Sequence, residues 1–265
     1  MGFIDLSGKT AVVTGAGGGI GRGVSIALAE AGCALVAANR NQESLDAVAG
    51  ELKQAGAICE PCRTDVSKEE DILALAKHVR DKLGRLDILV NCAGITVKKP
   101  ALEMTSEEWD RVINVNLRGV FLCCKHLGAL IKDSRGSEDD YGKVINIGSV
   151  GSFLGIPHSS SYCASKGGVL MLTKVLSTEW AQYHINVNAI VPGYIETPLS
   201  AGVLANPDAF KKVTSSIPLG KLGKPHDTAH LILFLVSQYS NYITGAGIPI
   251  DGGLLSAAYT VEKKD

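Results

Sequence analysis

The segment Lys9-Thr-Ala-Val-Val-Thr-Gly-Ala-Gly-Gly-Gly-Ile-Gly21 joins a β-branched run to a cluster of glycines, and helix-like sequence follows to Ala31. Residues 9–14 predict a strand, and a helix is expected at residues 20–31. Glycines permit a tight turn and allow backbone N–H groups and the helix N-terminus to approach a pyrophosphate. A strand, a glycine-rich turn and a helix in this order therefore predict a dinucleotide-binding site.

The spacing of these glycines departs from the common fingerprint Gly-x-Gly-x-x-Gly. Counted from Gly15 and Gly17, the third position is Ile20. The chain instead reads Gly15-x-x-x-Gly19-x-Gly21, which can serve the same physical purpose. We expect Gly15, Gly17, Gly19, Ile20 and Gly21 to contact the cofactor.

Strand and helix patterns alternate along the rest of the chain. Further strands are expected at residues 34–39, 58–62, 86–91, 143–148, 185–191 and 248–251, and further helices at 42–55, after 65, 106–132, 160–183 and 225–236. Ser67 is expected to cap the helix after residue 65, with Glu70 at the capping-box position. This order predicts an α/β fold: one Rossmann-like domain, residues 1–265, with a doubly wound parallel sheet of about seven strands and helices on both faces.

Composition excludes several classes of protein. The chain has 265 residues, of which 46% are hydrophobic and 20% charged, so it can bury a substantial core. The net charge is −1 and no basic stripe indicates nucleic-acid binding. No apolar run is long enough to span a bilayer, and the first residues do not resemble a signal peptide, so we expect a cytoplasmic protein without membrane partners.

Cysteine and histidine positions do not indicate a metal site. Seven cysteines form no even-numbered secreted framework. Cys59-Glu-Pro-Cys62 has the spacing of a redox motif or half a zinc site, but no second pair completes it. His226 and His230 lie four apart, where two ordinary imidazoles are the default interpretation. We expect no metal.

Tyr162 and Lys166 lie four residues apart. Ser149 lies thirteen residues before Tyr162 and directly follows the strand expected at 143–148. A four-residue step brings both side chains to one helical face. An ammonium near a phenol favours the phenolate and is expected to lower its pKa from about 10 toward neutrality. Such pairs are common on helices, but this pair follows the end of a strand, where open α/β sheets bind ligands. We therefore expect acid–base chemistry here.

The residues at the end of the strand 34–39 bear on the choice of cofactor. An NAD enzyme usually carries a carboxylate there for the ribose 2′-hydroxyl, whereas this chain has Asn39 followed by Arg40. Without the carboxylate, a 2′-phosphate is not repelled, and a guanidinium can bind it. We expect NADP to be preferred, with NAD possible.

Several separated motifs resemble the short-chain dehydrogenase/reductase family over about residues 6–253. The glycine-rich segment resembles its cofactor loop, and Asp65-Val66 lies where that family contacts the adenine. Asn91-Cys-Ala-Gly94 resembles its Asn-Asn-Ala-Gly element, with Cys92 in place of the second Asn. The remaining resemblances are a catalytic tetrad (Asn116, Ser149, Tyr162 and Lys166) and a nicotinamide-binding segment (Pro192, Gly193, Ile195 and Thr197). Asp65, Val66, Asn91, Ala93 and Gly94 are thereby implied as cofactor residues.

The resemblance implies hydride transfer between a nicotinamide and a carbon that carries an alcohol or a carbonyl. Tyr162 would be the acid in reduction and the base in oxidation, and Ser149 would orient the substrate oxygen. Lys166 would hold the nicotinamide ribose and lower the pKa of Tyr162. Asn116 would anchor a water in a proton relay, although a polar kink within a helix is its alternative interpretation, as a strand-end cap is for Ser149.

The substrate is expected to be a secondary alcohol or ketone: a sugar acid, a polyol or a similar small hydroxylated molecule. Motifs such as Pro192-Gly-Tyr-Ile-Glu-Thr197 resemble the sugar-acid branch of the family, the gluconate and deoxygluconate dehydrogenases. Two alternatives remain: a 3-oxoacyl-[acyl-carrier-protein] reductase, and a nucleotide-binding sensor or scaffold without turnover. The candidate substrate residues are Ser149, Gly151, Phe153, His158, Tyr162, Tyr194 and Glu196.

Three further expectations concern the outer parts of the chain. Residues 192–224 contain several prolines and are expected to form a substrate lid. The tail at residues 258–265 is expected to fray. The resemblance also implies a homotetramer, formed through the helices at 106–132 and 160–183 and the apolar segment 243–255.

Overall fold

The computed structural model describes residues 4–137 and 140–257. The expected frayed tail at residues 258–265 lies outside this range. The described residues form one seven-stranded parallel sheet in the order β3-β2-β1-β4-β5-β6-β7. Its strands are β1 (Thr10–Thr14), β2 (Ala34–Asn39), β3 (Cys59–Arg63), β4 (Ile88–Asn91), β5 (Gly142–Ile147), β6 (Ile185–Pro192) and β7 (Gly247–Ile250).

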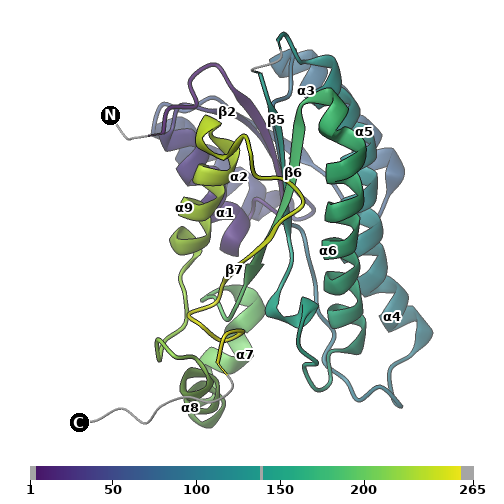
Figure 1. Cartoon of the computed structure of the whole chain (residues 1–265), viewed down its shortest axis with the longest axis vertical. Helices are drawn as coiled ribbons and strands as arrows, with labels where there is room; N and C mark the ends of the chain where they lie inside the picture. Colours follow the sequence, from purple (N-terminus) through teal and green to yellow (C-terminus); the bar gives the residue numbers. More distant parts are fainter. Residues whose placement is uncertain (1–3, 138–139, 258–265) are drawn as a thin grey trace.

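Helices cover both faces of the sheet, as expected (Figure 1). One face is covered by α1 (Gly19–Glu30), α2 (Gln42–Gln54) and α9 (Pro225–Val236). The other is covered by α3 (Glu69–Leu83), α5 (Gly119–Asp133) and α6 (Ser160–Trp180). The core is correspondingly split into two apolar clusters, one on each side of the sheet. All residues of β1, β4, β5 and β6 are buried, because both faces of a parallel sheet are covered.

The strand order reverses between β1 and β4, which lie side by side at the centre of the sheet. In open α/β sheets, such a reversal leaves a crevice at the carboxyl ends of the two strands. The Thr14 hydroxyl at the end of β1 accepts hydrogen bonds from the backbone N–H groups of Cys92 (3.1 Å) and Ala93 (3.3 Å). These bonds tie together the two loops that begin the site.

The predicted helix at residues 106–132 is divided in the structure. It consists of α4 (Ser106–Ile113), a π-helical turn at Asn114–Arg118, and α5. In this turn, the Gly119 N–H donates to the Asn114 carbonyl, a five-residue step instead of the four-residue step of an α-helix. Single π-turns within α-helices are rare and concentrate at functional sites. The turn contains Asn116, one of the predicted catalytic residues.

The predicted cap of α3 is wrong. Ser67 does not cap this helix, which begins at Glu69 with Lys68 at its N-cap and no capping side-chain hydrogen bond. The N–H and hydroxyl of Ser67 both donate to the Asp65 carboxylate, at 3.0 and 2.7 Å. Ser67 thus forms a local turn with the Asp65 side chain and does not cap the helix, because Asp side chains often bond to nearby residues in turns.

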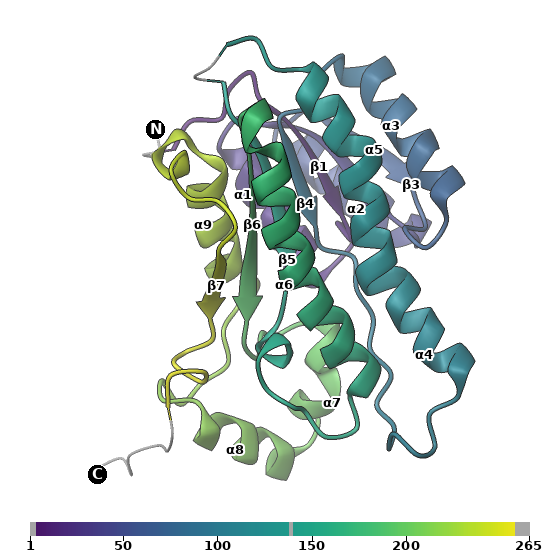
Figure 2. The same ribbon diagram turned by 45° about the vertical axis from the view of Figure 1, so that its right-hand side comes forward.

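A helical excursion lies beyond the carboxyl end of β6 (Figure 2). It contains two short helices, α7 (Ala201–Leu204) and α8 (Pro207–Ser216). A short parallel bridge between Ile195 and Gly223 closes its base. The expected lid segment, residues 192–224, therefore leaves the sheet and returns beside its own starting point.

Candidate active site

A cavity of about 580 Å³ opens at the carboxyl ends of the central strands. Its wall contains residues of the loop after β2 and of the start of α6, so the cavity extends from one to the other. The predicted residues that line it are Gly15, Gly19, Ile20, Gly21, Asn39, Arg40, Asp65, Val66, Ala93, Gly94, Ser149, Tyr162, Lys166, Pro192, Gly193, Tyr194, Ile195 and Thr197. The structure thus brings the glycine-rich loop and the Tyr–Lys pair to one cavity.

The glycine-rich loop has a backbone that only glycine adopts readily. Gly15 and Gly19 have φ angles of 68° and 52°, in the left-handed region. A Cβ on Gly21 would collide with the carbonyl of Gly15. The loop leads into the first turn of α1, where Gly19, Ile20 and Gly21 all line the cavity. The unpaired N–H groups of a helix start favour an anion such as pyrophosphate, so the residues present fit a dinucleotide.

The loop after β2 forms the opposite end of the cavity from the Tyr–Lys pair. The Asn39 amide donates to the Ser44 hydroxyl at 2.8 Å and to the Asn41 carbonyl at 3.2 Å. Arg40 is exposed and lines the cavity together with Asp65. Burial raises the pKa of Asp65, but hydrogen bonds from Ser67 and the charge of Arg40 outweigh it and hold this pKa below its usual value. This end therefore combines an exposed cation with an ionised carboxylate.

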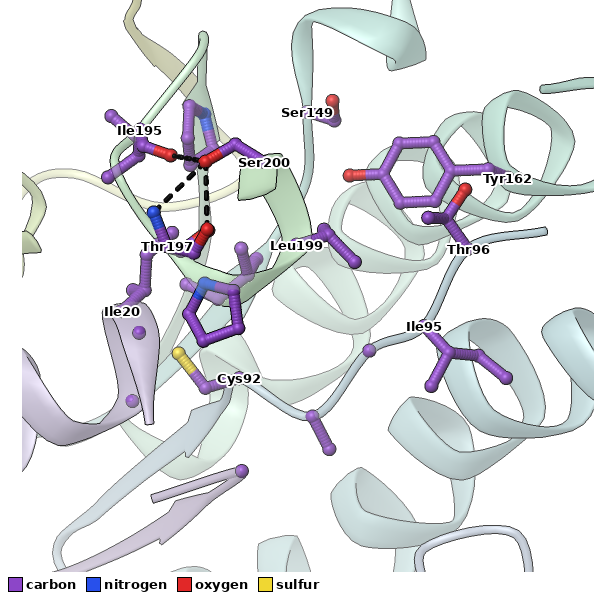
Figure 3. Close-up of a pocket in the computed structure, with 18 of the residues that line it drawn as sticks. Ile20, Cys92, Ile95, Thr96, Ser149, Tyr162, Ile195, Thr197, Leu199 and Ser200 are labelled. Atoms are coloured by element: carbon purple, nitrogen blue, oxygen red, sulfur yellow. Dashed lines mark hydrogen bonds between the residues drawn. The ribbon is translucent and has the colours of Figure 1, made fainter. Parts of the chain in front are cut away.

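Ser149 and Tyr162 lie at the end of the cavity away from Ile20 and Cys92, with the phenol oxygen directed into the space between them (Figure 3). Ser149 follows β5, and its hydroxyl accepts a hydrogen bond from the Gly151 N–H at 3.1 Å. Burial raises the pKa of Tyr162 above its ordinary value of 10.0 and outweighs a hydrogen bond with Ser149 that lowers it. The expected lowering of this pKa is thus wrong for the protein alone, because the desolvation of the phenolate dominates.

Lys166 lies under the same ring and is almost fully buried. Its ammonium is 5.8 Å from the centroid of the Tyr162 ring and donates to the Ile147 carbonyl at 2.6 Å. Burial lowers the pKa of Lys166 to about 8, against a smaller opposing effect of Cys92. In the structure, the cation therefore faces the ring and the backbone of β5. It is not among the groups that shift the pKa of the phenol.

Asn116 is fully buried behind the cavity wall. Its carbonyl oxygen accepts from the Ile95 N–H at 2.8 Å, and its amide donates to the Ile95 carbonyl at 2.9 Å. The same amide donates to the Ser165 hydroxyl at 3.2 Å. Both amide hydrogens are thus used to fix the segment after β4 and the start of α6. Asn116 does not line the cavity itself.

Six other predicted residues, all within the described part of the chain, also lie outside the cavity lining: Gly17, Asn91, Gly151, Phe153, His158 and Glu196. The Asn91 amide donates to the Asn146 side chain at 2.8 Å and braces neighbouring strands. Phe153, His158 and Glu196 are exposed. Gly151 is buried and contributes its N–H to Ser149.

The sequence reasoning missed several residues of the cavity wall. These include Ile95, Thr96, Lys98, Val150, Ile156, Leu199 and Val203. Ile95, Thr96 and Lys98 directly follow the Asn91–Gly94 motif, so their position after a central strand was an available signal. Leu199 and Val203 lie in the excursion after β6, where only the folded path of the chain shows which side chains face inward.

The described residues contain neither a membrane-crossing helix nor a group of three or more metal-ligating side chains. All seven cysteines are free thiols, and those at 33, 59, 123 and 124 are buried. Cys92 is the one that lines the cavity, and burial raises its pKa to about 12. Such a thiol stays protonated at neutral pH and is a poor nucleophile.

Comparison with known proteins agrees with this site. A family model described as enoyl-(acyl carrier protein) reductase matches residues 15–255. The chain is 39% identical to a 3-oxoacyl-[acyl-carrier-protein] reductase of Thermotoga maritima, over 94% of this chain and 99% of that protein. It is 37% identical to a 2-dehydro-3-deoxy-D-gluconate 5-dehydrogenase of Dickeya dadantii, over 95% and 97%.

A solved structure of a gluconate 5-dehydrogenase from Burkholderia cenocepacia, in complex with NADP and tartrate, superimposes with a TM-score of 0.90. It is 33% identical, and the match covers 96% of this chain and 98% of that one. The chain belongs to the short-chain dehydrogenase/reductase family. It is an oxidoreductase that acts on CH–OH groups, and the resemblance to the sugar-acid dehydrogenases of this family is confirmed.

Proposed function

We propose that the chain interconverts a secondary alcohol and a ketone on a small polyhydroxylated acid, with NADP as the preferred cofactor and Tyr162 as the proton carrier. The observation that carries this proposal is the meeting of Tyr162, Ser149 and Lys166 in one cavity with the glycine-rich start of α1. When bound, the dinucleotide supplies or accepts the hydride.

Tyr162 moves the proton that accompanies the hydride. In reduction, its hydroxyl donates to the developing alkoxide, and in oxidation, its phenolate accepts the alcohol proton. The raised pKa of Tyr162 keeps the phenol protonated at neutral pH in the protein alone, which favours its role as an acid. The Ser149 hydroxyl accepts from the Gly151 N–H and also hydrogen-bonds with Tyr162, so its hydrogen can turn from Tyr162 to the substrate oxygen when a substrate binds.

Lys166 and Asn116 support this chemistry in different ways. Lys166 lines the cavity and can turn its ammonium to the ribose of a bound cofactor. Asn116 holds Ile95 and Ser165, so its side chain positions the wall around Tyr162. A water of the proposed proton relay would accept no hydrogen bond from this side chain, because both of its amide hydrogens are already engaged.

The loop after β2 supports a preference for NADP. No carboxylate ends β2, and the side chain of Asn39 is committed to Ser44 and Asn41. The Arg40 side chain is exposed at the cavity rim, where it can pair with a 2′-phosphate. Arg40→Ala should lower kcat/KM for NADPH about tenfold and leave that for NADH nearly unchanged. Equal losses with both cofactors would refute this role.

The sugar-acid substrate is supported by the wall near Tyr162 and by the relatives. Hydroxyl groups of Thr96 and Ser149 line this end together with aliphatic side chains, and Tyr194 adds a further hydroxyl to the cavity wall. Several relatives are named as gluconate or deoxygluconate dehydrogenases. A 3-oxoacyl-[acyl-carrier-protein] reductase is similar to about the same degree, at 39% identity against 37%, so that activity is the second candidate. The first substrate panel should contain sugar acids, ketoses and 3-oxoacyl thioesters, each with both cofactors.

The test of the chemistry is Tyr162→Phe. The variant should bind NADPH as the wild type does and lose at least about 10²-fold in kcat on every active substrate of the panel. Tyr183→Phe is a matched control, because Tyr183 lies at the far end of α6 against Lys132 and does not line the cavity. Undiminished turnover by Tyr162→Phe with normal NADPH binding would overturn the proposal.

Assembly and closure are part of the proposed function. Phe121 on α5 and Met171 and Val175 on α6 are exposed apolar residues on the two helices expected to form a homotetramer. Residues 192–224 would close over the substrate as a lid, since Leu199 and Val203 reach the cavity. A monomer in light scattering would refute the tetramer. Protease sensitivity of this segment that is unchanged by NADPH and substrate would refute the lid.

A cytoplasmic location is also proposed. The seven free thiols fit a reducing compartment. Fractionation of cells that express the chain with an epitope tag tests this directly, and recovery outside the cytoplasm would refute it.

A further inference from the structure

Lys98 is a charged residue of the cavity wall that the chemistry above does not use. The other charged residues of this wall are Arg40 and Asp65 at the β2 end, and Lys166 beneath Tyr162. Asp65 interacts with Arg40, and Lys166 donates to Ile147. The Lys98 side chain is exposed, and within residues 4–137 and 140–257 it forms neither an ion pair nor a hydrogen bond.

The backbone around Lys98 is held at both ends. On one side, Ile95 makes two hydrogen bonds with the buried Asn116 side chain, at 2.8 and 2.9 Å. On the other, the Lys99 N–H donates to the His158 carbonyl at 2.8 Å, and the Lys99 ammonium pairs with Glu108 at 3.0 Å. A long side chain on a fixed segment thus lines the cavity from a defined position.

The location of Lys98 is at the substrate end. It follows Thr96, which Figure 3 shows at the same end of the cavity as Tyr162. Its neighbour Lys99 is bonded to the loop that leads into α6, the helix of Tyr162. By contrast, Arg40 follows β2, three strand spacings from β5, which is about 14 Å across the sheet. The two cations therefore serve different parts of the cavity.

The electrostatics at this end are one-sided. Asp65 is the single carboxylate among the described lining residues, and it lies at the β2 end. Glu108 is already paired with Lys99. The rest of the wall near Lys98 consists of hydroxyl and aliphatic groups such as Thr96, Ile95 and Ile156. An anion placed there would meet one unpaired ammonium and no lining carboxylate.

We propose that Lys98 binds the carboxylate of the substrate and so selects hydroxy and keto acids over neutral polyols. This inference rests on the proposed function, in which Tyr162 acts on a hydroxyl of a polyhydroxylated acid. Lys98 contacts the substrate at a distance from the reacting carbon, and it therefore contributes to binding in the ground state and transition state alike. Removal of the Lys98 ammonium is therefore expected to raise KM and to leave kcat unchanged.

The test compares Lys98→Met with the wild type on two substrates of equal length, gluconate and its uncharged counterpart glucitol, both with NADP. The variant should raise KM for gluconate about tenfold, because a charge-assisted contact at a partly exposed site is lost. The KM for glucitol should not change, and Lys98→Arg should restore most of the loss. Added salt should raise KM for gluconate in the wild type and have a smaller effect in Lys98→Met.

Lys53→Met is the matched control, since Lys53 is an exposed lysine of α2 outside the cavity. It removes the same charge from the protein and should leave both KM values unchanged. Thermal melts and NADPH affinity of each variant report folding and cofactor binding independently of the substrate.

The outcomes separate the two proposals. If the wild type prefers gluconate and Lys98→Met keeps its KM, the role of Lys98 is refuted and the proposed function stands. If the wild type prefers glucitol, or acts on neither substrate but on 3-oxoacyl thioesters, both the sugar-acid function and this inference are overturned. A fall in kcat with unchanged KM would also refute a binding role.

Discussion

The buried amide of Asn116 offers a quantitative test of how the site is held together. Replacement by Ala removes three hydrogen bonds, to the Ile95 N–H, the Ile95 carbonyl and the Ser165 hydroxyl, at 2.8, 2.9 and 3.2 Å. A typical internal hydrogen bond contributes about 1 kcal/mol net, and more where a buried partner is left unsatisfied. We therefore expect Asn116→Ala to lower the free energy of unfolding by about 3 kcal/mol.

In a protein of this size, such a loss lowers Tm by about 6–12 °C. Activity should fall as well, because the segment after β4 carries Thr96 and Lys98 and lies beside Tyr162. Displacement of a site by about 1 Å costs on the order of 10²-fold in rate. NADPH affinity should change less than kcat, because Asn116 does not line the cavity.

The assays are thermal melts, steady-state kinetics and NADPH titration by fluorescence. Asn114→Ala is the matched control, since Asn114 lies in the same π-turn and its side chain makes no hydrogen bond within the described residues. The reasoning is refuted if Asn116→Ala stays within about 0.5 kcal/mol of the wild type and keeps its kcat. It is also refuted if Asn114→Ala is equally damaging.

Three further predictions concern ionisation, stability and the glycine-rich loop. Burial raises the pKa of Tyr162, so an ultraviolet difference titration against Tyr162→Phe should show this phenol ionising above pH 10. Oxidised cofactor should lower the pH of this ionisation, because its nicotinamide is cationic. Ionisation of Tyr162 at neutral pH in the protein alone would contradict the prediction. Asp87→Asn should cost about 3 kcal/mol in urea unfolding at pH 7, because a buried carboxylate paired with Arg85 is lost. Burial raises the pKa of Asp87, but the hydrogen bonds and charges of its partners outweigh burial and hold this pKa below its usual value. The stabilisation by Asp87 is therefore present above the unfolded pKa of about 4 and is lost as the pH falls through the folded pKa. Equal stability of variant and wild type at pH 7 would show that the pair contributes nothing. Gly21→Ala should abolish NADPH binding in a fluorescence titration, since its Cβ would collide with the Gly15 carbonyl, and normal affinity would show that the loop is adaptable.

The position of the active site illustrates how the parallel sheet distributes its tasks. Polar networks stabilise the amino ends of the strands, where Asp87 binds Arg85, Arg135 and the Thr10 N–H. The carboxyl ends carry the cavity and its glycines. Substitutions near the amino ends should therefore change stability with little effect on kcat. Substitutions of Tyr162 and Ser149 should lower kcat with little effect on stability.

Much of the architecture followed from the sequence alone. The alternation of buried strands and amphipathic helices is a local property of the chain. Hydrophobic periodicity and the ends of helices at glycine are each set within about ten to fifteen residues of sequence. The glycine-rich turn could be predicted for the same reason, because positive φ at Gly15 and Gly19 restricts the residue type directly. The spacing of Tyr162 and Lys166 on a helix after β5 was sufficient to indicate the chemistry.

The tertiary structure decided the rest, because it depends on contacts between distant segments. The pKa of Tyr162 rises because the packed site desolvates the phenol, an effect that the four-residue spacing to Lys166 could not reveal. Asn116 lies in a π-turn and its side chain hydrogen-bonds with Ile95, so it holds two distant segments together. Ser67 hydrogen-bonds with Asp65 and does not cap the helix. The inward side chains at the substrate end, Lys98 among them, emerge only once the loops after β4, β5 and β6 converge on one cavity.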